Sequence, residues 1–399
     1  MTLSKNAKNA VIIGTLCSVA YLAVYIARNV LSAVSTQLEV QGIVDDVLYG
    51  TLTAAYFWFY ATGQLINGLI GQKVNARWMI SLGLLFAGVL NFTFPYILTS
   101  KISAILIYGM SGFFLAMIYS PMTKVVAENT LPIHATRCSL GYTFASFFGS
   151  PMAGILATLL VWQSVFTASS AMLVIMAVVA FVLFLLMEKK GVVKYNLYKP
   201  KKENGGAIKV LIKHNYIKFC FISLITGIIR TCWVSWLPKY FAGYLNYSVE
   251  SSSATFSIVT FIIAFTTFIA IFVYERLGRN INRTLILMFA IAFAFFVGTL
   301  FITHSIINIV FMVVAIMASN AAATMLWSVY CPSLRDTGFT SGATGFLDFI
   351  NYAAAGIFTL FIGAILGVIG WSGILIILVG LMLIGAIISI PFKKKQSKV

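Results

Sequence analysis

The amino-acid sequence predicts an all-α membrane protein with twelve transmembrane helices in two pseudo-symmetric six-helix bundles. The first reason is composition: 60% of the 399 residues are hydrophobic and only 9% are charged, whereas a soluble chain normally carries about 25% charged residues. The second is that the apolar residues fall into stretches of roughly 20 residues, the length that a membrane-spanning helix needs. The third is a weak internal repeat. The low charge excludes soluble enzymes, nucleic-acid binders and disordered proteins.

The predicted spans follow one another with short connections that contain turn residues. They cover residues 10–33, 46–70, 77–97, 103–126, 136–160, 163–187, 216–241, 252–275, 284–302, 306–329, 338–366 and 370–391. The connection from Glu188 to Asn215 is longer, polar and rich in lysine. We therefore expect an N-terminal bundle over 1–188, a cytoplasmic basic linker over 189–215 and a C-terminal bundle over 216–399.

The internal repeat supports this division into halves. Arg28 and Arg230 lie well inside the first span of each half, and Gly141-Tyr142 in the first half matches Gly345-Phe346 in the second. Two parallel six-helix repeats related by an axis along the membrane normal describe the major facilitator architecture, in which the substrate site lies near the midplane between the halves.

The net charge of +17 indicates the orientation of the chain in the membrane. Basic residues concentrate in the connections that a twelve-span count places on one side, and only Lys101 and Lys239 fall on the other. Because Lys and Arg mark the cytoplasmic side, we expect both termini in the cytoplasm, with a bacterial inner membrane as the location. The basic excess therefore indicates topology and not a nucleic-acid partner.

The residue types that carry enzyme chemistry are scattered. The five cysteines and three histidines lack the spacing of a metal site or a disulfide framework. The sequence also contains no phosphate-cradling glycine loop and no nucleophile–base set. We expect no enzyme activity, no cofactor and no metal, and a monomer whose partners are the lipid bilayer and a small anionic substrate.

Two arginines inside apolar spans predict that the substrate is an anion. Arg28 and Arg230 each cost about 2.5–3.5 kcal/mol to insert at a helix centre, so each must be paired or useful. A structural ion pair is the alternative explanation, but Asp348 is the only acidic residue well inside a span. Guanidinium groups present paired donors to phosphate or carboxylate oxygens. Two of them suit a phosphate dianion better than a monocarboxylate.

Polar and aromatic residues follow the arginines at helical spacing and suit a sugar or polyol attached to the anion. The candidate substrate-binding residues are Arg28, Arg230, Tyr25, Tyr21, Asn29, Gln64, Tyr60, Ser146, Trp233 and Asn320. Apart from the two arginines, each of them taken singly fits hydrogen bonding between helices or an interfacial anchor better than substrate binding, and it is the set as a whole that indicates a site. Asp348 is a coupling candidate, either as a resting partner of an arginine or as a protonatable group, because burial and a nearby arginine shift a carboxyl pKa in opposite directions.

The seventh span carries a specific family resemblance. The segment Arg230-Thr-Cys-Trp-Val-Ser-Trp236-Leu-Pro238-Lys-Tyr240 resembles the signature of the organophosphate:phosphate antiporter family, which includes bacterial glycerol-3-phosphate and hexose-6-phosphate transporters. Tyr25-Ile-Ala-Arg28-Asn29 resembles the first-span segment of the same family. The resemblance implies that Arg28 and Arg230 bind phosphate. It also implies exchange of a small organophosphate for inorganic phosphate by rocker-switch alternating access.

This chain departs from the family pattern at three site positions. It has Asn29 and Gln64 where the bacterial transporters have lysines, and Ser146 where they have a histidine. An acidic residue is added at Asp348. The departures leave open which organic phosphate is carried and how transport is coupled.

Three other functions compete with exchange. The runner-up is a proton-coupled symporter of an organic carboxylate, with Asp348 as the proton carrier. A membrane receptor that senses a sugar phosphate has no evident output domain in the linker or the short tails. Multidrug efflux of cations is disfavoured, because the central cavity would be positive.

Overall fold

The computed structural model describes residues 4–70, 74–195, 214–334 and 340–391, and helices account for nearly all of them. Most of the predicted basic linker (196–213) and the basic tail from residue 392 onward lie outside the described residues, as do Lys73 and Arg335. The described part contains no strand. The predicted all-α class is confirmed.

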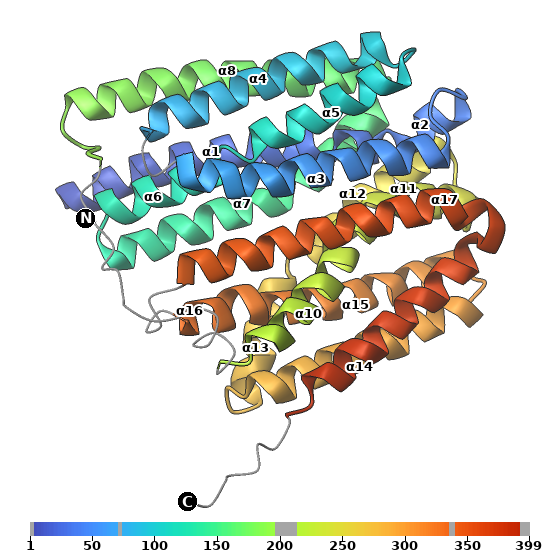
Figure 1. The fold of residues 1–399 in the computed structure, drawn as a ribbon. Helices are drawn as coiled ribbons and strands as arrows, with labels where there is room; N and C mark the ends of the chain where they lie inside the picture. Colours follow the sequence, from blue (N-terminus) through green and yellow to red (C-terminus); the bar gives the residue numbers. More distant parts are fainter. Residues whose placement is uncertain (1–3, 71–73, 196–213, 335–339, 392–399) are drawn as a thin grey trace, which may run out of the picture. The chain divides into compact units, whose positions relative to one another are not determined.

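Among the described residues of the first half, the structure has eight helices (Figure 1). They are α1 (Lys5–Ala33), α2 (Ser35–Val40), α3 (Asp46–Ile70), α4 (Ala76–Ile97), α5 (Lys101–Leu115), α6 (Tyr119–Asn129), α7 (Pro132–Leu159) and α8 (Trp162–Lys189). Ser4 caps α1 by accepting a hydrogen bond from the backbone N–H of Ala7. Pro132 begins α7, where its missing N–H costs nothing.

The second half follows the same pattern with more interruptions. Its elements are α10 (Tyr216–Gly227), η1 (Ile228–Trp233), α11 (Val234–Gly243), α12 (Val249–Ile263), α13 (Thr266–Arg276), α14 (Ile281–Phe301), α15 (Ser305–Thr324), η2 (Met325–Tyr330), α16 (Cys331–Ser333) and α17 (Thr340–Ser389). The elements η1 and η2 are π-helical turns inside the seventh and tenth spans. In α17, Gly370 has a φ of +64° and marks the turn between the last two spans.

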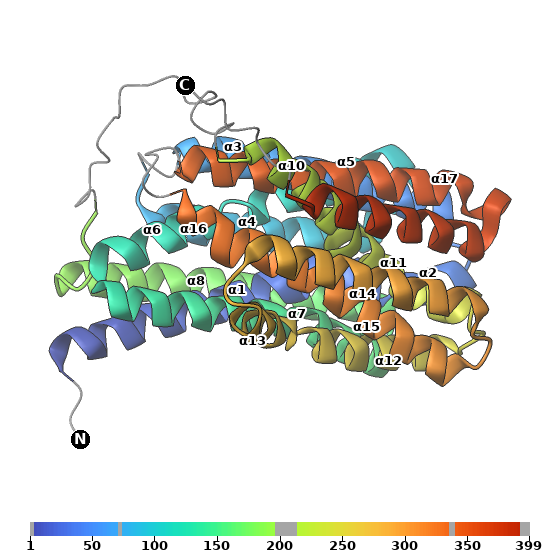
Figure 2. The same cartoon turned by 90° about the horizontal axis from the view of Figure 1, so that it is seen from below.

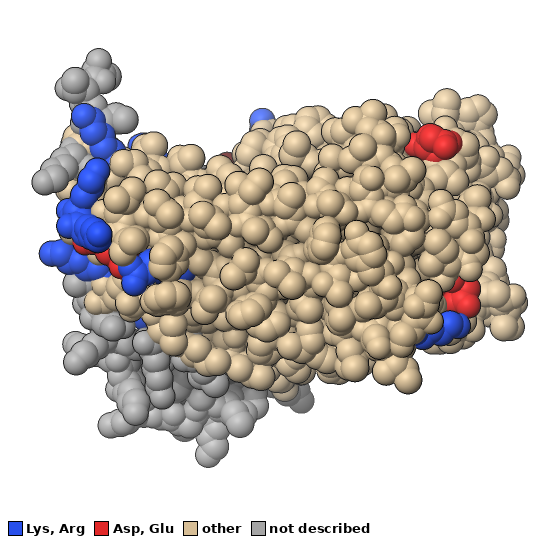
Figure 3. All heavy atoms as spheres, turned by 90° about the horizontal axis from the view of Figure 1, so that it is seen from above, with Lys and Arg blue, Asp and Glu red and all other residues tan. Residues whose placement is uncertain are grey.

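The helices account for all twelve predicted spans. Within the described residues, nine helical segments are long and apolar enough to cross a membrane, and the last of them, Ala343–Ser389, contains two spans joined at Gly370. The helices α3 and α7, of 25 and 28 residues, provide the remaining two spans. Figure 3 shows that the broad middle of the face carrying α4 and α8 is almost free of charged side chains. Such a surface suits the hydrocarbon core of a bilayer.

The chain divides into two compact units. Unit 1 comprises Met1–Lys202 together with two segments from the second half, Cys232–Ala264 and Ala355–Gly367. Unit 2 comprises Glu203–Thr231, Phe265–Ala354 and Val368–Val399. The boundaries between the units thus run through the seventh, eighth and eleventh spans. The division into two bundles and a linker stays a prediction.

Helix pairs form the core of each unit. In unit 1, α1 packs along α7, α4 along α8 and α3 along α5, while α12 also packs against α7. In unit 2, α14 packs along α15, and Figure 2 shows the two helices side by side. Glycines allow the closest approaches: a Cβ at Gly149 in α7 would lie 2.5 Å from the backbone carbonyl carbon of Tyr25 in α1.

The start of the predicted linker is attached to unit 1. Arg77 forms an ion pair with Glu188 at 2.7 Å, and Glu188 also accepts a hydrogen bond from the Tyr195 hydroxyl at 2.6 Å. Burial, followed by the hydrogen bond to this carboxylate, raises the pKa of Tyr195. The Asn129 side chain bonds both backbone groups of Lys194. These contacts fix the chain up to Tyr195.

Candidate functional site

Arg28 lies in the C-terminal part of α1 in unit 1, next to two aromatic rings. Its guanidinium carbon is 5.2 Å from the centroid of the Tyr25 ring and 5.2 Å from the centroid of the Tyr60 ring. Tyr25 is half-buried on the same helix, and Tyr60 in α3 is 1% exposed. Aromatic faces attract a cation within about 6 Å, most strongly away from water. The two tyrosines therefore stabilise a charge that lipid would not.

A cluster of tyrosines extends from Tyr25 along unit 1. The Tyr21 ring lies 4.9 Å from Tyr25, 5.6 Å from Tyr119 and 6.2 Å from Tyr142, measured between ring centroids. These four residues come from α1, α6 and α7. Tyrosine rings carry a hydroxyl on an apolar body, so the cluster offers stacking faces and hydrogen-bonding groups next to Arg28.

Three other predicted site residues of unit 1 are placed differently. The Asn29 amide donates to the carbonyl oxygen of Tyr25 at 2.6 Å, and the Ser146 hydroxyl donates to the carbonyl oxygen of Thr143 at 2.6 Å. In each case the acceptor is a carbonyl group of the same helix, four positions earlier for Asn29 and three for Ser146. Gln64 in α3 is half-buried. The structure thus brings Tyr25 and Tyr60 to Arg28, places Tyr21 against Tyr25, and gives Asn29 and Ser146 local partners.

Arg230 lies in unit 2 within the π-helical turn η1 and is half-buried. A π-helical turn widens the helix by one residue and breaks the regular hydrogen-bond ladder, and such turns are frequent at functional sites. The apolar segment that predicted a regular seventh span gives no sign of this turn. Trp233, the last residue of η1, falls in unit 1 and is 0% exposed.

The tenth span supplies polar groups to unit 2. Within the described residues, Asn320 Oδ1 and Trp327 Nε1 are buried and have no hydrogen-bond partner. Asn320 lies in α15 and Trp327 in η2, so seven positions separate them and they share a helix face. Buried polar atoms are normally hydrogen-bonded. An acceptor and a donor without a protein partner are candidates for hydrogen bonds to a polar ligand.

Asp348 is half-buried in unit 2, in the part of α17 that packs against α10. The Ser223 hydroxyl donates to the carbonyl oxygen of Leu347 at 2.7 Å, and the Asn351 amide donates to the carbonyl oxygen of Ser223 at 3.0 Å. A Cβ at Gly227 would lie 2.9 Å from the Cα atom of Asn351. This close contact holds the helix on both sides of Asp348.

The described residues contain no group of three or more His, Cys, Asp or Glu side chains that could hold a metal ion. In each unit, a guanidinium group offers charged hydrogen-bond donors of the kind that bind anions. Sequence reasoning missed the two π-helical turns and did not place Tyr119 in the site.

Comparison with known proteins gives a family match over most of the chain. The model of the Major Facilitator Superfamily matches residues 17–359. Among solved structures, a D-xylose–proton symporter superimposes with a TM-score of 0.76 at 11% identity, covering 97% of this chain and 98% of that one. A bacterial homologue of the human lysosomal transporter Spinster gives 0.74 at 15% identity, covering 97% of both chains. The fold is the major facilitator fold, as the sequence predicted.

Curated relatives match shorter parts of the chain. The glycerol-3-phosphate transporter of Bacillus subtilis is 22% identical over 260 residues, which is 59% of this chain and 58% of that protein. The membrane sensor protein UhpC of Salmonella typhimurium is 26% identical over 94 residues, 24% of this chain and 21% of that protein. The matched segment thus spans well under two thirds of either relative.

Proposed function

Because the chain belongs to the Major Facilitator Superfamily, whose members are transporters rather than enzymes, we propose that it exchanges a small organophosphate for inorganic phosphate. The substrate is of the sugar-phosphate or glycerol-phosphate type. Exchange proceeds by rocker-switch alternating access. The protein lies in a cell (inner) membrane with both termini in the cytoplasm, as the distribution of Lys and Arg predicts.

The observation that carries this proposal is the pair of arginines inside apolar spans. Arg28 lies in the first span of the first predicted half, and Arg230 lies in the first span of the second. Arg28 lies at cation–π distance from two aromatic rings, which stabilise its charge. The planar donor pairs of a guanidinium group suit phosphate oxygens. That both arginines act on one phosphate comes from the sequence pattern and its family resemblance. The likeness to a glycerol-3-phosphate transporter supports the same substrate class.

Counterflow in proteoliposomes tests the proposal. Vesicles containing the full chain are loaded with labelled inorganic phosphate, and glycerol phosphate, several sugar phosphates and several carboxylates are added outside, one at a time. We expect one organophosphate to stimulate phosphate efflux. Arg230→Ala should reduce that efflux by at least about 30-fold, because an anion would lose a desolvated charged partner. Arg283→Ala, at an exposed arginine in the first turn of α14, is the matched control and should transport normally.

Asp348 favours one second candidate, a proton-coupled symporter of an organic carboxylate. A half-buried carboxyl in the eleventh span is suited to carrying a proton. Carboxylate uptake driven by an acid exterior, without any phosphate efflux, and lost in Asp348→Asn, would overturn the antiporter proposal. Binding of a sugar phosphate without any exchange would instead indicate a sensor, which the similarity to UhpC makes a specific alternative.

A further inference from the structure

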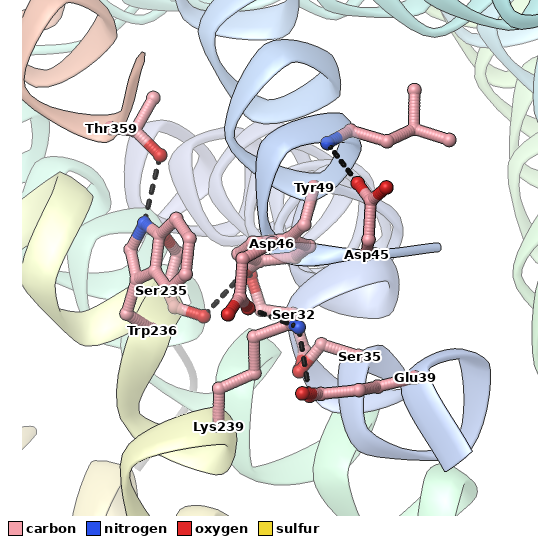
Figure 4. A network of polar contacts seen from close by, with 11 residues as sticks. Ser32, Ser35, Glu39, Asp45, Asp46, Tyr49, Ser235, Trp236, Lys239 and Thr359 are labelled. Carbon is pink, nitrogen blue, oxygen red and sulfur yellow. Dashed lines mark hydrogen bonds and ion pairs between the residues drawn. The ribbon is translucent and has the colours of Figure 1, made fainter. Parts of the chain in front are cut away.

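Lys239, in α11, is a buried cation that the proposed phosphate site does not use. Its side chain is 1% exposed. The ammonium Nζ lies 2.8 Å from Glu39 Oε2 in α2 and 2.7 Å from Asp46 Oδ1 at the start of α3. Figure 4 shows the ammonium between these two carboxylates. All three residues belong to unit 1, although Lys239 comes from the second half of the chain.

Further contacts extend this ion-pair cluster to the eleventh span. The Tyr49 ring lies 5.4 Å from the Lys239 ammonium, and the Tyr49 hydroxyl donates to the carbonyl oxygen of Ser235 at 2.5 Å. The Tyr49 ring also contacts the Trp236 ring, whose indole N–H donates to the Thr359 hydroxyl at 2.8 Å (Figure 4). Thus α2 and α3 from the first half are tied to segments of the seventh and eleventh spans within one unit.

Tight backbone packing accompanies the cluster. A Cβ at Gly50 in α3 would lie 3.1 Å from the Cα atom of Gly363 in α17, and the Ser253 hydroxyl in α12 donates to the carbonyl oxygen of Ala33 at 3.0 Å. These contacts again join a residue of the first half to one of the second. Alternating access requires that contacts between the two halves of the chain separate when the end containing α2 and the start of α3 opens.

We propose that Lys239, Glu39 and Asp46 form a latch. It holds closed the end of unit 1 that contains α2 and the start of α3. Burying the ammonium costs hydration energy, and its ion pairs return about as much, so a pair of this kind adds little net stability. The latch therefore opens without a large penalty when Lys239 returns to water. Removing the ammonium alone leaves two carboxylates side by side, which repel each other and favour the open state.

The inference uses the alternating access of the proposed function but no particular substrate. Its test is therefore independent of the phosphate assay. Ser35 in α2 is 1% exposed and lies in the same region of Figure 4, so a cysteine introduced there reports opening. The full chain with Ser35→Cys is placed in lipid nanodiscs and treated with a hydrophilic maleimide. Mass spectrometry of the peptides then measures the labelling rate at position 35.

We expect Lys239→Met to raise the labelling rate at position 35 about 10-fold or more, because loss of the cation shifts the closed–open equilibrium. Lys239→Arg should keep the low rate, since it preserves the charge. Lys101→Met is the matched control, because Lys101 is an exposed lysine at the start of α5. The charge distribution predicts it on the same side of the membrane as Lys239. The native Cys17, 1% exposed, must stay unlabelled in every variant that is folded.

Two further variants keep the test informative if Lys239→Met does not fold. Glu39→Gln and Asp46→Asn each remove one charge from a carboxylate that is 45% or 32% exposed, so neither buries a new unpaired group. Each should raise the labelling rate at position 35 by a smaller factor than Lys239→Met. An unchanged rate in these variants and in Lys239→Met, with Cys17 protected, would overturn the latch. Loss of phosphate exchange with a normal latch response would contradict only the proposed substrate.

Discussion

At the scale of residues, Arg28 shows how an apolar helix accommodates a cation next to aromatic rings. The flanking rings of Tyr25 and Tyr60 lie at cation–π distance and attract the guanidinium without neutralising its charge. The aromatic arrangement thus suits binding and release of an anion.

Substituting Tyr60 tests the role of its ring face. We expect Tyr60→Phe, which keeps the ring, to change the half-saturating phosphate concentration by no more than about two-fold. Tyr60→Leu should raise that concentration by about 3- to 30-fold, the range of a desolvated cation–π contact. The measurement is the concentration dependence of phosphate exchange in proteoliposomes, with thermal stability as the control for folding. Equal effects of the two substitutions would show that the hydroxyl, and not the ring face, matters.

The sequence predicted which tyrosines lie near Arg28, but it did not predict the hydrogen bonds of the polar residues nearby. The i, i+4, i+7 spacing of Tyr21, Tyr25 and Arg28 places them on one helix face, and this follows from helix geometry alone. Asn29 and Ser146 bond to carbonyl groups of their own helices. Short polar side chains make such bonds in any helix, so their presence in a polar stripe does not reveal where they point.

At the scale of elements, hydropathy predicted where the helices lie and missed how they are interrupted. The predicted span 46–70 begins at Asp46, the first residue of α3, because the sequence changes there from polar to apolar. The π-helical turn η1 and the break between α5 and α6 leave hydropathy unchanged. Both depend on packing and backbone hydrogen bonds, which a one-dimensional pattern does not contain.

Gly149 tests the contact between α7 and α1. A methyl group there would overlap Tyr25, three positions before Arg28, and would push the two helices apart. We expect Gly149→Ala to cost about 1–3 kcal/mol of stability, as overpacking does in other cores, and to lower transport. The measurement is the thermal unfolding midpoint in detergent. Gly380→Ala, where a Cβ meets nothing within 4 Å, is the control; equal midpoints for both variants would contradict this account.

At the scale of the whole molecule, the grouping of residues into units was the least predictable feature. The sequence halves meet at the basic linker, whereas unit 1 combines the first half with segments of the seventh, eighth and eleventh spans. Lys239 contacts carboxylates 200 and 193 positions away. Before the fold is known, nothing in the sequence except its isolated position on the less basic side distinguishes this lysine.

The central claim is that Arg28 and Arg230 carry a phosphate group across the membrane. Self-exchange of labelled inorganic phosphate in proteoliposomes tests it most directly, since the organic substrate need not be known. We expect exchange by the unmodified chain. Arg28→Lys and Arg230→Lys should each lower it by at least about 10-fold, because lysine keeps the charge but lacks the planar pair of donors, while Arg283→Lys should not. Absence of exchange by the folded, unmodified protein, or full exchange by both lysine variants, would contradict the claim.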